Sequence, residues 1–193
     1  MNWANISRFA HSARKGASSM IERILIAGTG GQGIVTLGKM LARAAIDTYP
    51  FVTFFPSYGA EVRGGTSYCQ VILSSNEISS PLAERFDTII AMNQQAAERF
   101  IAYIEQKGLA IANSTLCKVN SLDLHFIRIQ ATKIADQLGN VKAANLVMLG
   151  SVLARKSIVS LSKMEKTIRT GFTGLPEAIM EINMNAFYWG LSI

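Results

Sequence analysis

The sequence predicts an α/β domain with a Rossmann-like, mostly parallel sheet that is flanked by helices and includes some antiparallel strands. Three observations support this fold class. Short β-branched runs alternate along the chain with segments of helical period. A glycine cluster at residues 28–33 joins the first apolar run to the first helical segment. The 193 residues show no internal repeat and no linker, and this length suits one domain.

The expected strands are short runs rich in β-branched, aromatic or other apolar residues, bounded by turn residues. The run at 52–55 ends at Pro56, which cannot donate to a sheet. Residues 64–80 are expected to add the antiparallel strands, because apolar and polar side chains alternate in them and a polar turn is included. The strands are predicted at 23–27, 52–55, 67–73, 87–92, 109–112 and 126–129.

The expected helices repeat apolar residues at spacings of three and four, as Leu37, Met40 and Leu41 do in the first. Ser162 and Glu165 have the spacing of a capping box, which predicts the start of another helix. Pro176 suits the first turn of the last one. Besides the helix that Ser162 would open, helices are predicted at 32–46, 94–105, 131–138, 145–153 and 176–191.

Residues 1–19 are rich in Ser, Ala and basic side chains and have no acid. They are predicted to be a disordered or transit-like extension, or an artefact of an upstream start because Met20 follows. The domain is therefore expected at 20–193. Without this tail the formal net charge of +6 falls to 16 basic against 13 acidic side chains, which are scattered. This pattern argues against nucleic-acid binding.

The apolar stretches are too short or too interrupted to span a bilayer, so no membrane segment is expected. Cys69 and Cys117 stand far apart without a C-x-x-C spacing, and both are expected to be buried small residues. An iron–sulfur cluster usually needs four thiolates, so the chain is not expected to hold one alone. This cysteine usage predicts a reducing, cytoplasmic compartment.

The glycine cluster is typical of a strand-to-helix turn whose backbone can bind an anion. Gly28 is expected to allow a turn with positive φ, Gly30 to let backbone N–H groups approach a ligand, and Gly33 to let the helix pack on the strand. The helix start then offers unpaired N–H groups to a phosphate. Gly31 and Gln32 complete the loop. A plain tight turn without a ligand is the alternative.

A dinucleotide site of the usual kind also needs an Asp or Glu at the end of the second strand, about 20 residues after the last glycine. The corresponding residues, 51–56, contain no acid. NAD binding is therefore disfavoured.

A second unusual loop follows the second expected strand. Tyr58, Glu61 and Arg63 precede Gly64 and Gly65 in a segment without regular period, and a loop of this length is often functional. Arg63 could grip a phosphate or carboxylate, or it could pair with Glu61 as a structural clamp. Because both loops follow strands, they are expected to meet at one edge of the sheet.

Groups suited to catalysis are scarce. His11 lies in the tail and His125 stands alone before a strand. No Ser/His/Asp set, metal-ligand cluster or P-loop can be assembled from the spacing. We therefore expect no catalytic residue and no metal site.

Taken together, these motifs resemble the gamma subunit of 2-oxoacid:ferredoxin (acceptor) oxidoreductases from about Ile21 onward. The residues that carry the resemblance are Gly28-Thr29-Gly30-Gly31-Gln32-Gly33, Tyr58-Gly59-Ala60-Glu61-Val62-Arg63-Gly64-Gly65, Ile78-Ser79-Ser80-Pro81, residues 87–93, Asn145 with Gly150, and Asn183-x-Asn185-Ala186-Phe187-x-x-Gly190. The two glycine motifs in this order are far more specific than either alone.

The resemblance implies a complex that oxidatively decarboxylates a 2-oxo acid, passes electrons through iron–sulfur clusters to ferredoxin or another acceptor, and forms an acyl-CoA. It implies that alpha and beta subunits, and in some relatives a ferredoxin-like delta subunit, hold the clusters and thiamine diphosphate with Mg. The gamma chain would bind none of these alone, would cover the active site and help to bind coenzyme A, and would be inactive by itself. Pyruvate, 2-oxoglutarate and other oxo acids are all used by such relatives.

On this basis the backbone of Gly30–Gly33 and the side chain of Arg63 are expected to face the coenzyme A phosphates or the seam between subunits. Gln32 would orient the loop or a ligand, and Glu61 would hold Arg63. Two alternatives remain at this point: a purely architectural subunit, and a free-standing oxidoreductase that uses NAD or FAD.

Overall fold

A computed structural model describes residues 20–57, 66–118 and 126–193. Its centre is a six-stranded sheet in the order β2-β3-β1-β4-β5-β6. β1, β4, β5 and β6 run parallel to one another, whereas β3 is antiparallel to both β1 and β2. The predicted α/β class, with a mostly parallel sheet and some antiparallel strands, is confirmed. The strands are β1 (Ile21–Gly28), β2 (Phe51–Pro56), β3 (Ser67–Ser74), β4 (Phe86–Ala91), β5 (Ile104–Asn113) and β6 (Phe126–Ile129).

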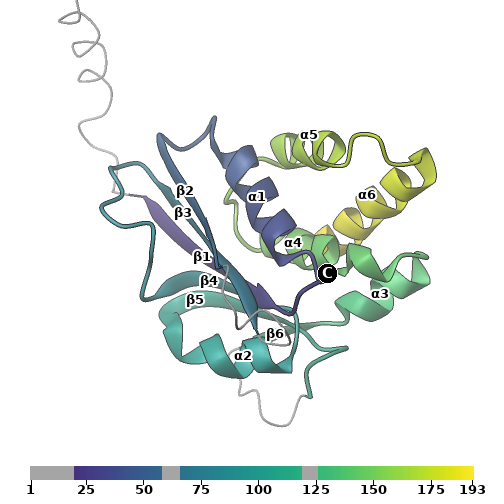
Figure 1. Ribbon diagram of the computed structural model, residues 1–193, viewed down its shortest axis with the longest axis horizontal. Helices are drawn as coiled ribbons and strands as arrows, with labels where there is room; N and C mark the ends of the chain where they lie inside the picture. Colours follow the sequence, from purple (N-terminus) through teal and green to yellow (C-terminus); the bar gives the residue numbers. More distant parts are fainter. Residues whose placement is uncertain (1–19, 58–65, 119–125) are drawn as a thin grey trace, which may run out of the picture.

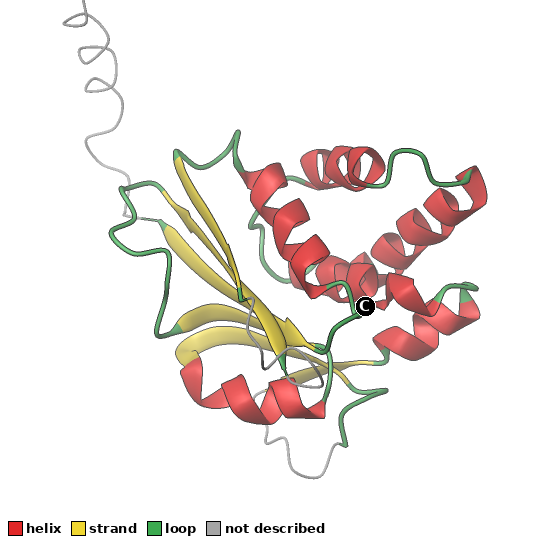
Figure 2. Ribbon diagram, in the orientation of Figure 1, coloured by secondary structure: helices red, strands yellow, loops and turns green. Residues whose placement is uncertain are grey.

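Helices cover the two faces of the sheet unequally (Figures 1 and 2). Among the described residues, most helices gather on one face, and α2 with the residues that follow it packs on the other. The α-helices are α1 (Ile34–Ala45), α2 (Gln94–Phe100), α3 (Ala131–Gln137), α4 (Ala144–Leu153), α5 (Leu161–Gly171) and α6 (Glu177–Leu191), with short 3-10 helices η3 (Ile101–Tyr103) and η5 (Val141–Ala143).

Two cores follow from the alternation of side chains along each strand. On β1, Ile24 and Ile26 face the larger core, with α1, α3, α4, α5 and α6, while Leu25 and Ala27 face α2. Every residue of α4 is buried, which explains why its sequence lacks a polar face. Close packing of α4 on α6 requires Gly150, because a Cβ there would lie 2.8 Å from the backbone nitrogen of Leu191.

Two sequence-based element predictions are wrong. The helix expected at 94–105 ends at Phe100, and η3 then leads into β5 at Ile104. The apolar residues after Phe100 lie in a 3-10 turn and a strand instead of in a longer α-helix. The capping box predicted at Ser162 is not formed. α5 begins two residues earlier, and Ser160 Oγ accepts a hydrogen bond from the Lys163 backbone nitrogen over 3.4 Å.

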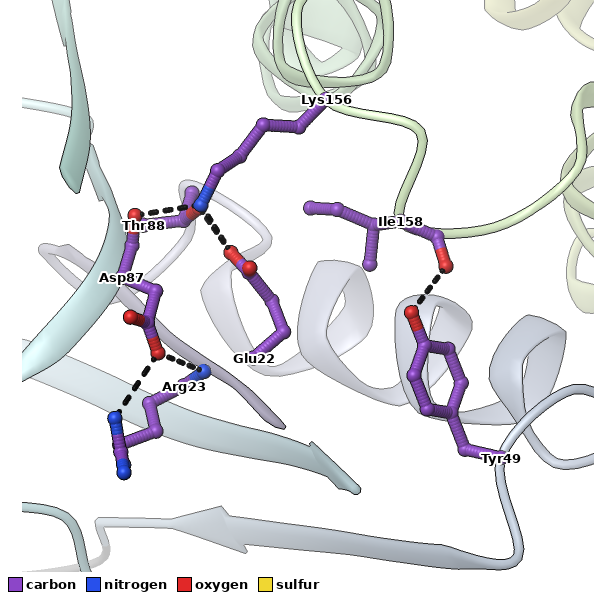
Figure 3. A network of polar contacts seen from close by, with 7 residues as sticks. All are labelled: Glu22, Arg23, Tyr49, Asp87, Thr88, Lys156 and Ile158. Atoms are coloured by element: carbon purple, nitrogen blue, oxygen red, sulfur yellow. Dashed lines mark hydrogen bonds and ion pairs between the residues drawn. The ribbon is translucent and has the colours of Figure 1, made fainter. Parts of the chain in front are cut away.

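A polar network fixes the amino-terminal ends of β1 and β4 to the segment after α4 (Figure 3). Lys156 Nζ lies 2.7 Å from Glu22 Oε1 and donates to the Asp87 carbonyl over 2.8 Å. Thr88 Oγ1 donates to the same Glu22 oxygen over 2.6 Å. Arg23 pairs with Asp87 over 3.3 Å. These groups are only partly exposed. The network lies at the end of the sheet opposite the glycine loop and holds the strands there to the segment after α4.

Candidate functional site

The candidate site is the glycine loop that joins β1 to α1, at the carboxyl ends of the parallel strands. Gly28 is the last residue of β1, and Gly33 is the N-cap of α1. The first turn of α1 has no acidic side chain. Its backbone N–H groups therefore present a partial positive charge at this edge of the sheet.

The glycines of the loop are needed for different reasons from those predicted. Gly28 does not have positive φ; a Cβ there would lie 2.5 Å from Gln32 Oε1 and 2.9 Å from Met92 Cβ, so close approach excludes a side chain. Gly33 has a φ of 73°, in the left-handed region, and a Cβ would collide with the Asn145 amide of α4 rather than with a strand. Both expectations from the sequence were therefore wrong in their physical reason.

Gly30 and Gly31 border open space. A Cβ built on either glycine meets no atom of the described residues within 4 Å, although Gly31 has a φ of 88°. Packing among the described residues thus does not account for the absence of a side chain at Gly30. A group from outside could approach the backbone here, as the prediction for Gly30 requires.

Side-chain amides hold the loop from three directions. Gln32 Oε1 accepts from the Thr29 backbone nitrogen over 2.7 Å and from Asn93 Nδ2 over 3.2 Å. Asn93 follows β4 and also caps α2, accepting from the Ala96 nitrogen over 2.9 Å. On the other side, Asn145 Nδ2 donates to the Gly33 carbonyl over 3.4 Å. The loop is therefore fixed by a side chain from the β4–α2 junction and one from α4, as well as by its own residues.

The Met92 carbonyl extends this arrangement to β5. It accepts from Gln32 Nε2 and from Asn113 Nδ2, each over 3.4 Å. Asn113, the last residue of β5, is fully buried and also donates to Thr132 Oγ1 over 2.7 Å. Asn113 was missed by the sequence analysis. Its signal was an amide directly after the apolar run 109–112, as Asn93 directly follows the run 87–92.

The second predicted loop, with Tyr58, Glu61, Arg63, Gly64 and Gly65, lies outside the described residues. Its expected meeting with the glycine loop therefore stays a prediction. The flanking strands do fix where it leaves the sheet, because Ser67 at the start of β3 is the register partner of Gly28. On the other flank, the Ser57 nitrogen donates to the Tyr68 carbonyl over 2.9 Å.

The strand order gives a further reason against a dinucleotide site. In the dinucleotide-binding fold the second strand lies beside the first, in the order 3-2-1-4-5-6. Here β3 separates β2 from β1, so the end of β2 is two strands away from Gly28. Even an acid at that end would not stand where a ribose beside the glycine loop needs it.

The two cysteines are buried, as predicted, and they belong to different cores. Cys69 faces the α1 side of the sheet and donates from Sγ to the Ile34 carbonyl over 3.4 Å, whereas Cys117 faces the α2 side. Burial raises the pKa of Cys69 to about 12 and that of Cys117 to about 11. The two thiols cannot ligate one cluster. Within 20–57, 66–118 and 126–193, no three His, Cys, Asp or Glu side chains are grouped to hold a metal ion.

Among the described residues, no helix has both the length and the apolar content that crossing a membrane would take.

Comparison with known proteins identifies the family. Residues 23–193 match the model of the pyruvate ferredoxin/flavodoxin oxidoreductase family. The chain belongs to this family. The resemblance inferred from the glycine motifs is thereby confirmed, and the match covers all of the candidate site described above.

Relatives in this family differ in size. Ketoisovalerate oxidoreductase subunit VorA of Methanothermobacter thermautotrophicus is 33% identical over 164 residues, which are 84% of this chain and 34% of VorA. The chain thus spans about a third of that relative's length. The crystal structure of the keto/oxoacid ferredoxin oxidoreductase gamma subunit from Geobacter sulfurreducens is similar along nearly its whole length. It has 29% identity and a TM-score of 0.74, covering 89% of this chain and 96% of that one.

A more distant structure shares the fold. The 2-oxoglutarate:ferredoxin oxidoreductase from Magnetococcus marinus, solved with 2-oxoglutarate, coenzyme A and succinyl-CoA bound, has a TM-score of 0.76 and 22% identity. The similarity covers 91% of this chain and 31% of that one. The same fold therefore occurs as one part of a larger oxidoreductase chain.

Proposed function

We propose that this chain is the gamma subunit of a 2-oxoacid:ferredoxin oxidoreductase and acts only in complex with alpha and beta subunits, with or without a ferredoxin-like delta subunit. The family match over residues 23–193 carries this proposal. The Geobacter gamma subunit, of which 96% is covered, supports a subunit of this size.

The complex would decarboxylate a 2-oxo acid, transfer two electrons to ferredoxin or another acceptor, and join the acyl group to the sulfur of coenzyme A. Thiamine diphosphate with Mg would supply the carbanion chemistry, and iron–sulfur clusters would carry the electrons. Following the family resemblance, we assign both groups to the partner subunits.

In this complex the glycine loop would help to bind coenzyme A. Three observations support the assignment: open space beside Gly30 and Gly31, an α1 amino terminus without an acid, and a position at the carboxyl edge of the parallel strands. Arg63, held by Glu61, would contribute a guanidinium from the neighbouring loop, with Tyr58, Gly64 and Gly65 shaping its approach.

An architectural role is the second candidate, and Gln32 favours it. Its oxygen already accepts two hydrogen bonds and its nitrogen donates one, all within the protein. Gln32 thus orients the loop and has little capacity left for a ligand. On this alternative the glycine loop would contact only a neighbouring subunit.

Calorimetric titration of the purified complex with coenzyme A tests the proposal. Binding that weakens at least tenfold in Arg63→Ala, with subunit stoichiometry unchanged, is expected for the site. The architectural role predicts unchanged affinity and altered assembly. If Arg63→Ala changed neither the Michaelis constant for coenzyme A nor assembly, the assignment of Arg63 would be wrong.

The dependence on partners has a separate test. The purified chain is expected to show no oxidation of pyruvate, 2-oxoglutarate or branched 2-oxo acids with a ferredoxin or viologen acceptor. Turnover by the chain alone would contradict its role as a subunit.

A further inference from the structure

A cavity lies on the face of the sheet that α2 covers. It has a volume of about 440 Å³. This volume lies within the range of about 300–1,000 Å³ that is usual for small-molecule sites. Four aromatic rings and two polar side chains form most of its lining: Tyr68, Phe86, Phe100, Tyr103, Gln70 and Arg85.

The aromatic walls are held in place by contacts within the protein. The rings of Tyr68 and Phe100 meet edge to face with centres 5.3 Å apart, and Tyr103 lies 6.3 Å from Phe100. The Arg99 guanidinium stands 5.2 Å from the centre of the Phe100 ring. These contacts keep the rings in position without an occupant, so binding would lose little side-chain entropy.

The opposite wall is fixed by Arg85. Its Nη1 donates to the Ala102 and Ile104 carbonyls over 3.3 and 3.4 Å, which ties the segment before β4 to η3. A guanidinium carries five N–H donors, so several remain for an anion at the mouth of the cavity. Glu84 also lines the mouth and is the acid beside this cation.

Gln70 supplies a donor in the depth of the cavity. The residue is 7% exposed, and its Oε1 accepts from the Ala83 backbone nitrogen over 2.8 Å. Across the described ranges no acceptor is hydrogen-bonded to Gln70 Nε2. This N–H can therefore donate to an occupant that offers an acceptor at this point.

We propose that this cavity binds a purine nucleotide. The base would stack on Tyr103 and Phe100, a ring nitrogen would accept from Gln70, and the phosphates would meet Arg85. A plain hydrocarbon ring would leave Gln70 unpaired, and a smaller pyrimidine would cover less of the aromatic walls. The proposal does not rest on the role given to the glycine loop, because none of its residues belongs to that loop.

Two sources could deliver such a nucleotide: the adenosine end of coenzyme A, or free ADP or ATP. Calorimetry of the full chain with ADP measures binding, and competition by coenzyme A separates the sources. Displacement of ADP by coenzyme A but not by pantetheine assigns the cavity to coenzyme A. Failure of coenzyme A to displace bound ADP assigns it to a free nucleotide.

Tyr103→Ala is the decisive variant, with Tyr188→Ala as its control. The two tyrosines are similarly exposed, at 47% and 41%, and Tyr188 lies on α6 away from the cavity. Loss of base stacking is expected to weaken ADP binding by about 5- to 100-fold in Tyr103→Ala. Tyr103→Phe and Tyr188→Ala are expected to bind ADP as the unmodified chain does. Arg85→Met should weaken ADP but leave adenosine unchanged.

Three results would overturn the proposal. The first is ADP affinity weaker than about 1 mM. The second is equal loss of affinity in Tyr103→Ala and Tyr188→Ala. The third is N-acetyl-tyrosinamide binding as tightly as ADP, which would indicate an aromatic side chain of a partner instead. Circular dichroism of each variant checks that the chain remains folded.

Discussion

Asn93 Nδ2 donates to Gln32 Oε1 over 3.2 Å, so the N-cap residue of α2, just after β4, holds the loop that follows β1. The same Gln32 oxygen accepts from the Thr29 nitrogen over 2.7 Å. One side chain thus satisfies the loop's backbone and ties it to β4. The shape of the glycine loop is set by the protein before any ligand arrives.

Gln32→Leu is therefore expected to lower the free energy of unfolding by about 1–3 kcal/mol, because Thr29 N and Asn93 Nδ2 lose their acceptor. Gln137→Leu is the matched control, since Gln137 is exposed at the end of α3. Its effect should stay within about 0.5 kcal/mol. Urea unfolding measures both, and equal effects would show that the Gln32 contacts carry no stability.

Gly33→Ala should destabilise the chain more than Gly174→Ala. Both glycines have positive φ, at 73° and 90°, so each alanine meets backbone strain of about 1–3 kcal/mol. Only at Gly33 does the new Cβ also collide with Asn145. The double variant Gly33→Ala/Asn145→Ala should lose less stability than the sum of the losses in the two single variants. Strict additivity in thermal unfolding would exclude this contact.

Lys156→Met is expected to cost about 1–3 kcal/mol of stability, because it leaves Glu22 without its cation in a partly buried position. Lys163→Met is the control. Its Nζ lies 3.9 Å from Asp47, whose side chain is 79% exposed, and such a pair contributes about 0–1 kcal/mol. Denaturant titration compares the two, and a larger loss in Lys163→Met would contradict the network of Figure 3.

Stability is expected to fall above pH 9, partly through Cys69. Burial raises the pKa of this thiol from 9.0 to about 12. As pH rises, the thiol therefore loses its proton first in the unfolded chain. The contribution of the protonated Cys69 thiol to folding stability is complete below pH 9 and is lost as pH rises toward 12. At pH 10 the loss is about 1.4 kcal/mol. Cys69→Ala should show a correspondingly smaller fall between pH 8 and pH 10; an identical fall would exclude this linkage.

The fold class could be predicted from the sequence because strands and helices differ in hydrophobic period. The apolar runs of β1 and β4 and the spacing of Leu37 and Leu41 on α1 carry that signal locally. The end of α2 could not be predicted in this way. Residues 101–105 suit a helix by composition, and only pairing with β4 makes strand from Ile104 onward.

The site could be predicted only in part. The position of the glycine loop follows from a local motif, but the reason for Gly33 depends on Asn145, which is 112 residues away in the sequence. The same holds for Gln32, whose partner Asn93 lies between β4 and α2. Spacing along the chain cannot reveal such contacts. The placing of β3 between β1 and β2 likewise depends on tertiary packing.

The most direct test of a ligand role for the glycine loop is the Michaelis constant for coenzyme A in a purified complex that carries Gly30→Val. A Cβ at Gly30 meets no described atom within 4 Å, so packing among the described residues predicts a folded chain with unchanged thermal stability. The proposed site predicts at least a tenfold rise in this Michaelis constant. An unchanged constant in a fully assembled complex would contradict it.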